Sequence, residues 1–189
     1  MLKKISVIIS SGIIISCFVL LYIKKSTGTG EVMQKTITLE SSAFTNNTTI
    51  PEKYTGESLD VSPPLSWQNI PTETQSLVLI SDDPDAPEET WVHWVVYDLP
   101  ATINKLSENA DIKSLGGTVG KNSFDSPKDM TYGGPMPPKG HGPHRYYFKI
   151  YALNKKLNLP AGATKQEVEA AMQGNIIATG QLIGIFERK

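Results

Sequence analysis

The sequence predicts a mainly β domain, an antiparallel two-sheet sandwich with one or two short helices, preceded by an apolar N-terminal segment. Short runs rich in β-branched and aromatic residues recur along the chain. Clusters of Pro, Gly, Asn and Asp separate these runs, as turns between strands require. A convincing helix pattern occurs only near the C-terminus. Many strands followed by a late helix are typical of a sandwich with helical decoration.

The N-terminal segment is long enough to cross a membrane. Ile5–Ile23 holds 19 uncharged residues between two pairs of lysines, and a spanning helix needs about 20. The run exceeds the signal-peptide core of about 7–15 residues and lacks a clean cleavage site. We therefore expect residues 1–25 to be an uncleaved membrane anchor. A cleaved signal remains open, and so does a lipoprotein, because the run ending at Cys17 resembles a lipoprotein box.

The remaining chain divides into a linker, residues 26–34, and one domain, residues 35–189. A short tail ahead of the first apolar run usually stays inside, which places the domain outside the cytoplasm, periplasmic or extracellular. About 155 residues can bury a core without cross-links. Cys17 is the only cysteine, so the domain contains neither a disulfide nor a thiol nucleophile.

The charge of the domain argues against nucleic acid as a partner. Without the two lysine pairs that flank the apolar run, 14 basic and 19 acidic residues remain, a formal charge of −5. Proteins that bind the phosphate backbone of nucleic acids carry basic surfaces instead.

The expected elements follow from local periodicity. Alternating or apolar runs predict five strands: Thr36–Glu40, Ser76–Ile80, Trp91–Leu99, Arg145–Leu153 and Ala178–Phe186. Thr164 and Glu167 have capping-box spacing, and Gly174 suits the left-handed position after a helix. Three apolar side chains fall on one face of this helix: Val168, Ala171 and Met172.

All three histidines lie in two segments, 82–94 and 133–146. Strand alternation predicts that each strand histidine heads a mainly apolar row beside its Pro/Gly loop, where it would line the mouth of a pocket. The rows are Trp91, His93, Val95 and Tyr97, and His144, Tyr146, Phe148, Ile150 and Ala152. His141 is expected to be a solvated loop residue, and Arg145 to form a structural ion pair.

The chemistry of these segments suits a small anion. The loop glycines, among them Gly134, allow backbone N–H groups to approach a ligand, and prolines such as Pro137 hold the loop before binding. A carboxylate such as Asp83, paired to an imidazole, favours the charged donor form of that imidazole. A zwitterion also fits, with its phosphate on His144 and its ammonium on a carboxylate.

Alternative readings remain open at this point. A lone histidine facing a core is usually structural. A hydrolase could use His144 or His93 as base with Asp83 as orienter, but only Ser81 and Thr131 lie near in sequence. A metal site would draw on four residues: Asp83, Asp85, His93 and His144. The preferred interpretation is a protein that is not an enzyme and has no metal or cofactor.

The two segments resemble the signature regions of the phosphatidylethanolamine-binding protein family, also called Raf kinase inhibitor-like proteins, in its bacterial and archaeal branch. The matching motifs are Asp83-Pro84-Asp85-Ala86-Pro87 with His93, then Gly134-Pro135, Pro137-Pro138, Gly140, Gly142 and His144-Arg145-Tyr146. Met136 departs from the small residue that is common in bacterial relatives.

The resemblance implies a two-sheet β fold with a pocket for phosphate, acetate-like anions or a phosphoethanolamine head group. It also implies the residues that line this pocket: Asp83, His93, Gly134, Pro137, His144 and Tyr146. We therefore expect a binding module that modulates or inhibits an unknown protein partner. The kinase-inhibitor role is not carried over, and a homodimer is left open.

Overall fold

The computed structural model describes residues 35–189. The predicted anchor, residues 1–25, and linker, residues 26–34, lie outside the described residues. Among residues 35–189, no helix is both long and apolar enough to cross a membrane.

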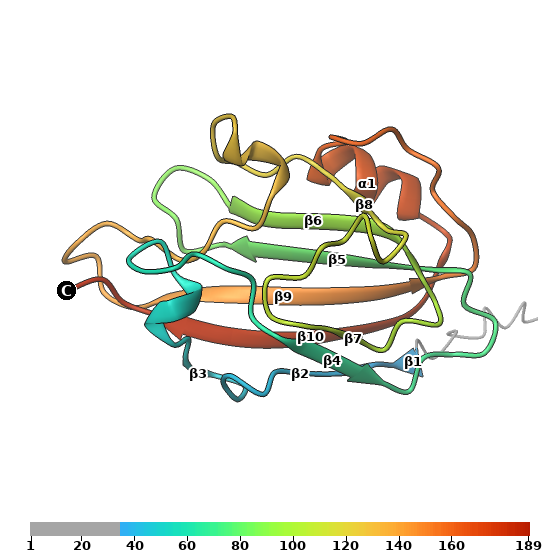
Figure 1. Cartoon of the computed structure of the whole chain (residues 1–189), viewed down its shortest axis with the longest axis horizontal. Coiled ribbons are helices and arrows are strands. Elements are labelled where there is room, and N and C mark those ends of the chain that lie inside the picture. Colours follow the sequence, from blue (N-terminus) through green and yellow to red (C-terminus); the bar gives the residue numbers. More distant parts are fainter. Residues whose placement is uncertain (1–34) are drawn as a thin grey trace, which may run out of the picture. The chain divides into compact units, whose positions relative to one another are not determined.

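The larger of two sheets has seven strands in the order β1-β10-β9-β5-β6-β8, with β3 also on the outer edge of β10. Figure 1 shows the four long strands stacked across the centre of the domain. The bounds of the strands are β1 Lys35–Thr36, β3 Thr48–Thr49, β5 Ser76–Asp83, β6 Trp91–Pro100, β8 Thr118–Val119, β9 His144–Leu153 and β10 Ile176–Phe186.

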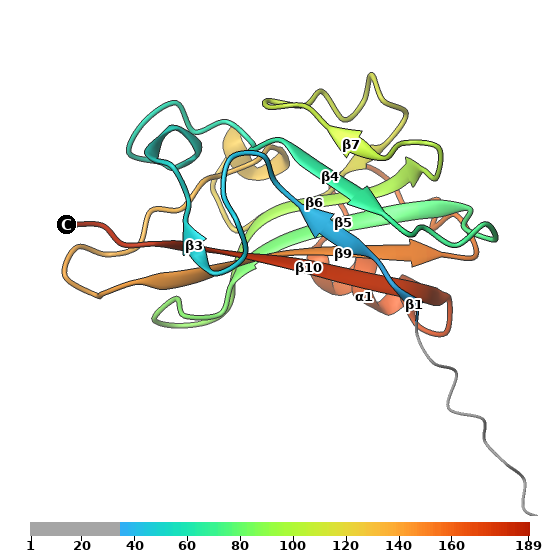
Figure 2. The same cartoon turned by 90° about the horizontal axis from the view of Figure 1, so that it is seen from below.

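A smaller antiparallel sheet covers one face of the large sheet. Its strands are β2 Thr38–Glu40, β4 Leu65–Gln68 and β7 Lys105–Leu106, in the order β2-β4-β7. Figure 2 shows β4 and β7 on one side of the large sheet and helix α1, Lys165–Met172, on the other. Two 3₁₀ turns, Glu52–Tyr54 and Lys128–Met130, lie in the loops.

Two apolar clusters correspond to these layers. The larger cluster fills the space between the sheets and includes Trp67, Trp94 and Phe148. The smaller cluster packs Val78 and Tyr97 of the large sheet against α1 and its flanking loop. The long strands β5, β6 and β9 are therefore covered on both faces, which explains why the run that predicted β5 is continuously apolar.

The predicted helix is confirmed together with its start signal. Thr164 accepts a hydrogen bond from the Glu167 N–H, and the Glu167 carboxylate accepts one from the Thr164 N–H, 2.8 Å away. Gly174 follows with a φ of +72°, as expected for a helix end. We predict that Thr164→Ala lowers stability by about 1 kcal/mol, because the cap satisfies an otherwise free N–H group. Urea unfolding would measure this loss, and an unchanged midpoint would contradict it.

The predicted antiparallel two-sheet arrangement has an exception at one edge of the large sheet. β1 and β3 run parallel to β10, whereas all other pairs are antiparallel. The chain from residue 35 to residue 49 runs along β10. It pairs with β10 through β1 and again through β3, and between these two strands it forms β2 of the smaller sheet. The predicted strand Thr36–Glu40 is thereby divided between the two sheets.

A bulge in β6 overturns the predicted face of His93. Ser81 of β5 pairs with Trp94 and Asp82 pairs with Val92, so His93 is the extra residue between them. An extra residue interrupts the alternation of side chains. His93 therefore packs edge-on against Tyr146, while Val95 and Tyr97 lie in the cluster next to α1.

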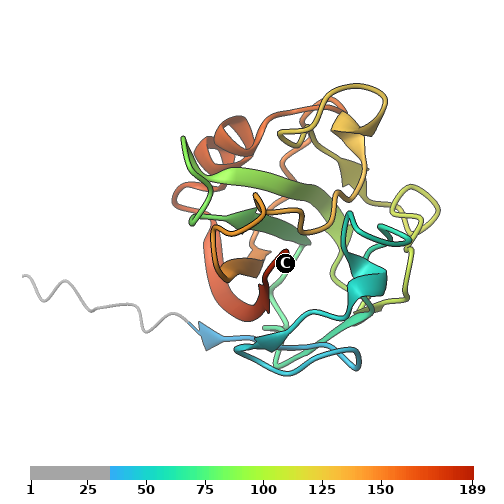
Figure 3. The ribbon, with the colours of Figure 1, turned by 90° about the vertical axis from the view of Figure 1, so that its left-hand side faces the viewer.

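The ends of the long strands gather the two histidine segments at one end of the sandwich. Asp83 closes β5 opposite Trp91, which opens β6, and His144 opens β9 opposite Phe186, the last residue of β10. These strand ends lie near the C-terminus, on the left of Figure 1. Figure 3 looks onto this end.

Candidate functional site

A buried aspartate–histidine pair forms the centre of the site. His144 Nδ1 lies 2.7 Å from Asp83 Oδ2, and the two side chains are only 3% and 5% exposed. An ionised carboxylate can only accept a hydrogen bond, so His144 Nδ1 carries the proton. The other oxygen of Asp83 accepts the Asp85 N–H at 2.8 Å, which fixes the carboxylate within its own turn. The ring of His144 is thereby oriented, with Nε2 directed away from Asp83.

His93 is held by a backbone carbonyl. Its Nδ1 lies 2.5 Å from Gly133 O, and the Gly133 N–H returns a bond of 3.0 Å to His93 O. Since a carbonyl only accepts, Nδ1 is the protonated nitrogen. Burial lowers the pKa of the His93 imidazole, which therefore stays neutral at physiological pH and keeps Nε2 as an acceptor.

Tyr146 contributes a buried hydroxyl group. Its ring lies 5.1 Å from that of His93, edge to face. Burial, reinforced by the negative charge of Asp83, raises the pKa of the Tyr146 phenol above its ordinary value, so the group remains an O–H donor. Among residues 35–189 this hydroxyl makes no hydrogen bond of ordinary geometry, and the nearest carboxylate that acts on it is that of Asp83. A buried polar group is normally paired, and a polar ligand would satisfy this one.

Gly134 has a structural role that differs from the expected one. Its N–H donates to Asp60 Oδ1 at 2.6 Å, and Asp60 also pairs with Lys128. The Gly133 N–H is likewise occupied, so neither amide is directed at a ligand. Sequence reasoning missed Asp60, which lies in a distant loop and has a φ of +56°. Pro137 is buried in the same loop, while Met136 is 48% exposed.

Asp85 and Arg145 pair on the outer side of the site, as predicted for Arg145. The guanidinium Nη2 lies 2.7 Å from Asp85 Oδ1, and Nε lies 2.9 Å from Oδ2. Hydrogen bonding to Arg145 lowers the pKa of Asp85 to about 2. Because this carboxyl has a depressed pKa in the fold, its contribution to stability is complete above about pH 4 and is lost as the pH falls toward 2.

His141 lies closer to the site than the sequence suggested. Its side chain is exposed, as predicted, but its Nδ1 is 3.2 Å from His144 Nε2. The one sequence signal for a contact between His141 and His144 was their spacing. It predicted no contact, because the intervening Gly-Pro excludes the helix on which such a pair normally shares a face. The two histidines line a hollow of about 600 Å³ together with Asp85, Pro143, Arg145 and Ile185.

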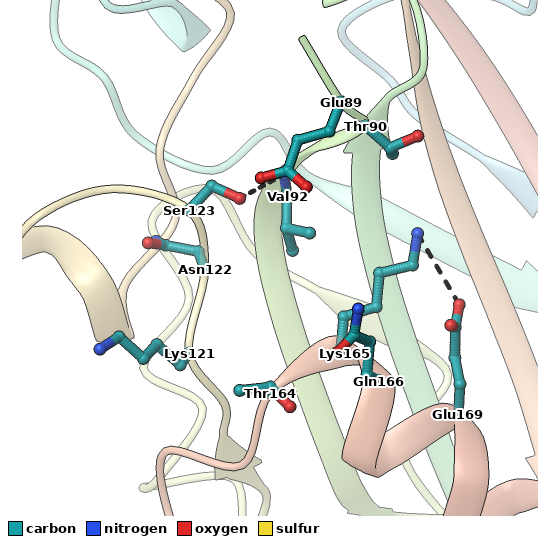
Figure 4. Close-up of a pocket in the computed structure, with 10 residues that line it drawn as sticks. All are labelled: Glu89, Thr90, Val92, Lys121, Asn122, Ser123, Thr164, Lys165, Gln166 and Glu169. Carbon is teal, nitrogen blue, oxygen red and sulfur yellow. Dashed lines mark hydrogen bonds and ion pairs between the residues drawn. The ribbon is translucent and has the colours of Figure 1, made fainter.

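A second hollow of similar size lies on the α1 side of β6 (Figure 4). It contains none of the predicted site residues. Its lysines are ion-paired: Lys121 with Asp129, and Lys165 with the buried Asp82 and with Glu169. Of the six predicted site residues, only His144 lines the first hollow, which is therefore the candidate site.

Several residues named for the alternative centres have other partners in the structure. Both Asp85 oxygens bond Arg145, and within residues 35–189 no group of three or more His, Cys, Asp or Glu side chains has an arrangement that could hold a metal ion. Thr131, named for a hydrolase, donates its hydroxyl to Lys128 O at 2.9 Å. Ser81 is buried on β5.

The fold and the site together define a two-sheet β domain with a buried aspartate–histidine pair beside a hollow at the strand ends. The sequence profile described as phosphatidylethanolamine-binding protein matches residues 40–187. The chain belongs to the phosphatidylethanolamine-binding protein family.

Relatives place the chain in the bacterial and archaeal branch of that family. A UPF0098 protein of Pyrococcus abyssi is 44% identical, over 86% of this chain and 89% of its own length. A solved Chlamydia trachomatis homologue of phosphatidylethanolamine-binding protein is 39% identical with a TM-score of 0.74, over 82% of this chain and 99% of its own. Escherichia coli YbcL, described as a new member of the mammalian family, has a TM-score of 0.74 at 29% identity, over 81% and 99%.

Proposed function

We propose that the domain is a non-enzymatic binding module for a small anion or a phosphoethanolamine-type head group, and that its occupancy modulates or inhibits a protein partner. The observation that carries this proposal is the buried Asp83–His144 pair, whose imidazole lines the hollow at the strand ends. The protonated Nε2 of His144 is the donor that we assign to the anion, whereas the hydroxyl of Tyr146 does not line the hollow and interacts with Asp83. Family membership agrees with such a pocket.

The charges around the hollow support an anion. The positive charge of Arg145 balances the negative charge of Asp85, and a protonated His144 balances that of Asp83. Neither Asp83 nor Asp85 then repels an entering anion. Proton loss from His144 would leave Asp83 uncompensated. Since the imidazolium is also the donor, affinity depends on the charged form of His144.

We also propose that the domain is not an enzyme. A His/Asp hydrolase needs a nucleophile within reach of the base. The hydroxyl of Thr131 is bonded to a carbonyl oxygen away from both histidines. No specific contact among the described residues favours hydrolysis over binding.

Titration of the full chain with inorganic phosphate and with phosphoethanolamine tests the binding proposal. We expect the imidazole chemical shifts of His93 and His144 to change. With sulfate, whose charge is constant in this range, we expect the affinity to weaken as the pH rises from 6 to 8, because the anion prefers the imidazolium. Absence of any shift at millimolar ligand would mean that the histidines are structural. Tighter binding of phosphoethanolamine than of phosphate would indicate an ammonium contact; equal binding would indicate an anion site alone.

We further propose that residues 1–25 anchor the domain outside the cytoplasm, with lipidation at Cys17 or cleavage as the alternatives. Membrane fractionation and protease treatment of intact cells would test this arrangement. Recovery of the full chain in the cytosol would overturn it. Light scattering would measure the molar mass of the purified chain and so show whether it forms the homodimer that the sequence left open.

A further inference from the structure

His144 has no free ring nitrogen in this structure. Nδ1 donates to Asp83 Oδ2 at 2.7 Å, and Nε2 lies 3.2 Å from His141 Nδ1. With a neutral His144, His141 is the donor in the second contact; with a protonated His144, His141 is the acceptor. In both states the imidazole of His141 occupies the position that an anion bound to Nε2 needs.

Geometry requires His141 to move when an anion binds. An oxygen that accepts from both nitrogens at about 2.9 Å each, at an open angle, needs those nitrogens roughly 4.5–5.5 Å apart. The observed separation is 3.2 Å. The anion must therefore push the exposed ring aside by about 1.3 Å or more.

The segment that carries His141 is built to allow such a shift. Gly140 and Gly142 flank it with φ values of +75° and +84°, and a Cβ at either glycine would meet nothing within 4 Å. The backbone of His141 makes one turn bond, from its N–H to Pro138 O at 3.2 Å. Its ring bonds only His144 among the described side chains, so a small rotation breaks a single contact.

Resting on the proposed anion site, we propose that His141 is a second imidazole donor of that site, which turns from His144 to the anion when the ligand enters. Two imidazoles then each supply one N–H⁺ to the same anion. The remaining charged groups around them are compensated, because Asp83 faces His144 and Asp85 faces Arg145. His93 takes up no proton, since its Nδ1 donates to Gly133 O and burial lowers its pKa.

Proton uptake distinguishes two imidazole donors from one. The slope of log Kd against pH equals the number of protons taken up on binding. Sulfate is a suitable probe because its charge is constant between pH 6 and 8.5. For the full chain we expect a slope that approaches two at the alkaline end, and for His141→Ala a slope that approaches one. At pH 6 we expect His141→Ala to bind sulfate about tenfold more weakly, the lower end of the loss expected for one hydrogen bond between charged groups.

Lys139→Ala is the matched control, because it removes an exposed positive charge from the same segment but no imidazole. Its slope should stay near two. Equal slopes in the wild type and in His141→Ala overturn the inference, as does a wild-type slope of one. Failure of the wild type to bind sulfate overturns the proposed function itself, which separates the two results.

Discussion

His144→Ala is expected to weaken phosphate binding at pH 6 by at least about tenfold, the largest effect on affinity that we expect from a single change. The substitution removes the donor Nε2 and leaves the Asp83 carboxylate, 5% exposed, without its partner. Loss of a hydrogen bond between charged groups costs about 1.5–3 kcal/mol, and the uncompensated carboxylate then repels the anion. Calorimetric titration with phosphate measures the change.

Stability must be followed separately, because an unpaired buried carboxylate is costly by itself. Removing one partner of a buried ion pair destabilises a protein by about 3–5 kcal/mol. The double variant Asp83→Asn/His144→Ala removes the buried charge and should regain part of this stability without regaining affinity. Wild-type affinity in folded His144→Ala would show that His144 is structural and that the anion binds elsewhere.

Gly134→Ala is expected to destabilise the fold by about 3 kcal/mol, the upper end of overpacking by one methyl group. An added Cβ would press against the carbonyl oxygen of Tyr54 and lie 2.8 Å from the Thr55 Cα. Both are backbone atoms, which cannot yield as the third neighbour, the Asp60 side chain at 2.8 Å, can. For a domain of this size the melting temperature should fall by roughly 6–12 °C, as scanning calorimetry would show.

Gly140→Ala is the matched control for this prediction. Gly140 lies in the same loop with open space around it, and only its positive φ penalises alanine, by about 1–2 kcal/mol. Gly134→Ala should therefore unfold at a clearly lower temperature than Gly140→Ala. The opposite order would mean that the loop relaxes away from Tyr54 at little cost.

Local signals were sufficient for the long elements. β5, β6, β9 and β10 lie where continuous or alternating apolar runs predicted strands, and α1 begins at its capping box. The row from His144 to Ala152 is confirmed, since its alternate residues are buried. These features depend on neighbours within a few residues, which the sequence displays directly.

Features that depend on pairing between distant segments could not be predicted from local sequence patterns. The bulge at His93 is defined only by the register with β5, and it moved the imidazole to the face of Tyr146. The role of Asp60 as acceptor for the Gly134 N–H joins positions 74 residues apart. The contact of His141 with His144 depends on how two glycines direct the loop.

The sequence by itself determined the class of fold and the family, because these follow from periodicity and from two long motifs. It also named Asp83 and His144, which pair in the structure, but neither Asp60 nor the contact of His141 with His144. Only the tertiary structure decided how these residues are used: Asp83 on His144, Asp85 on Arg145, His93 on a carbonyl oxygen. The physical reason is that a carboxylate or an imidazole can form hydrogen bonds or ion pairs with several alternative partners. The choice among them is made by strand register and burial, which no short stretch of chain contains.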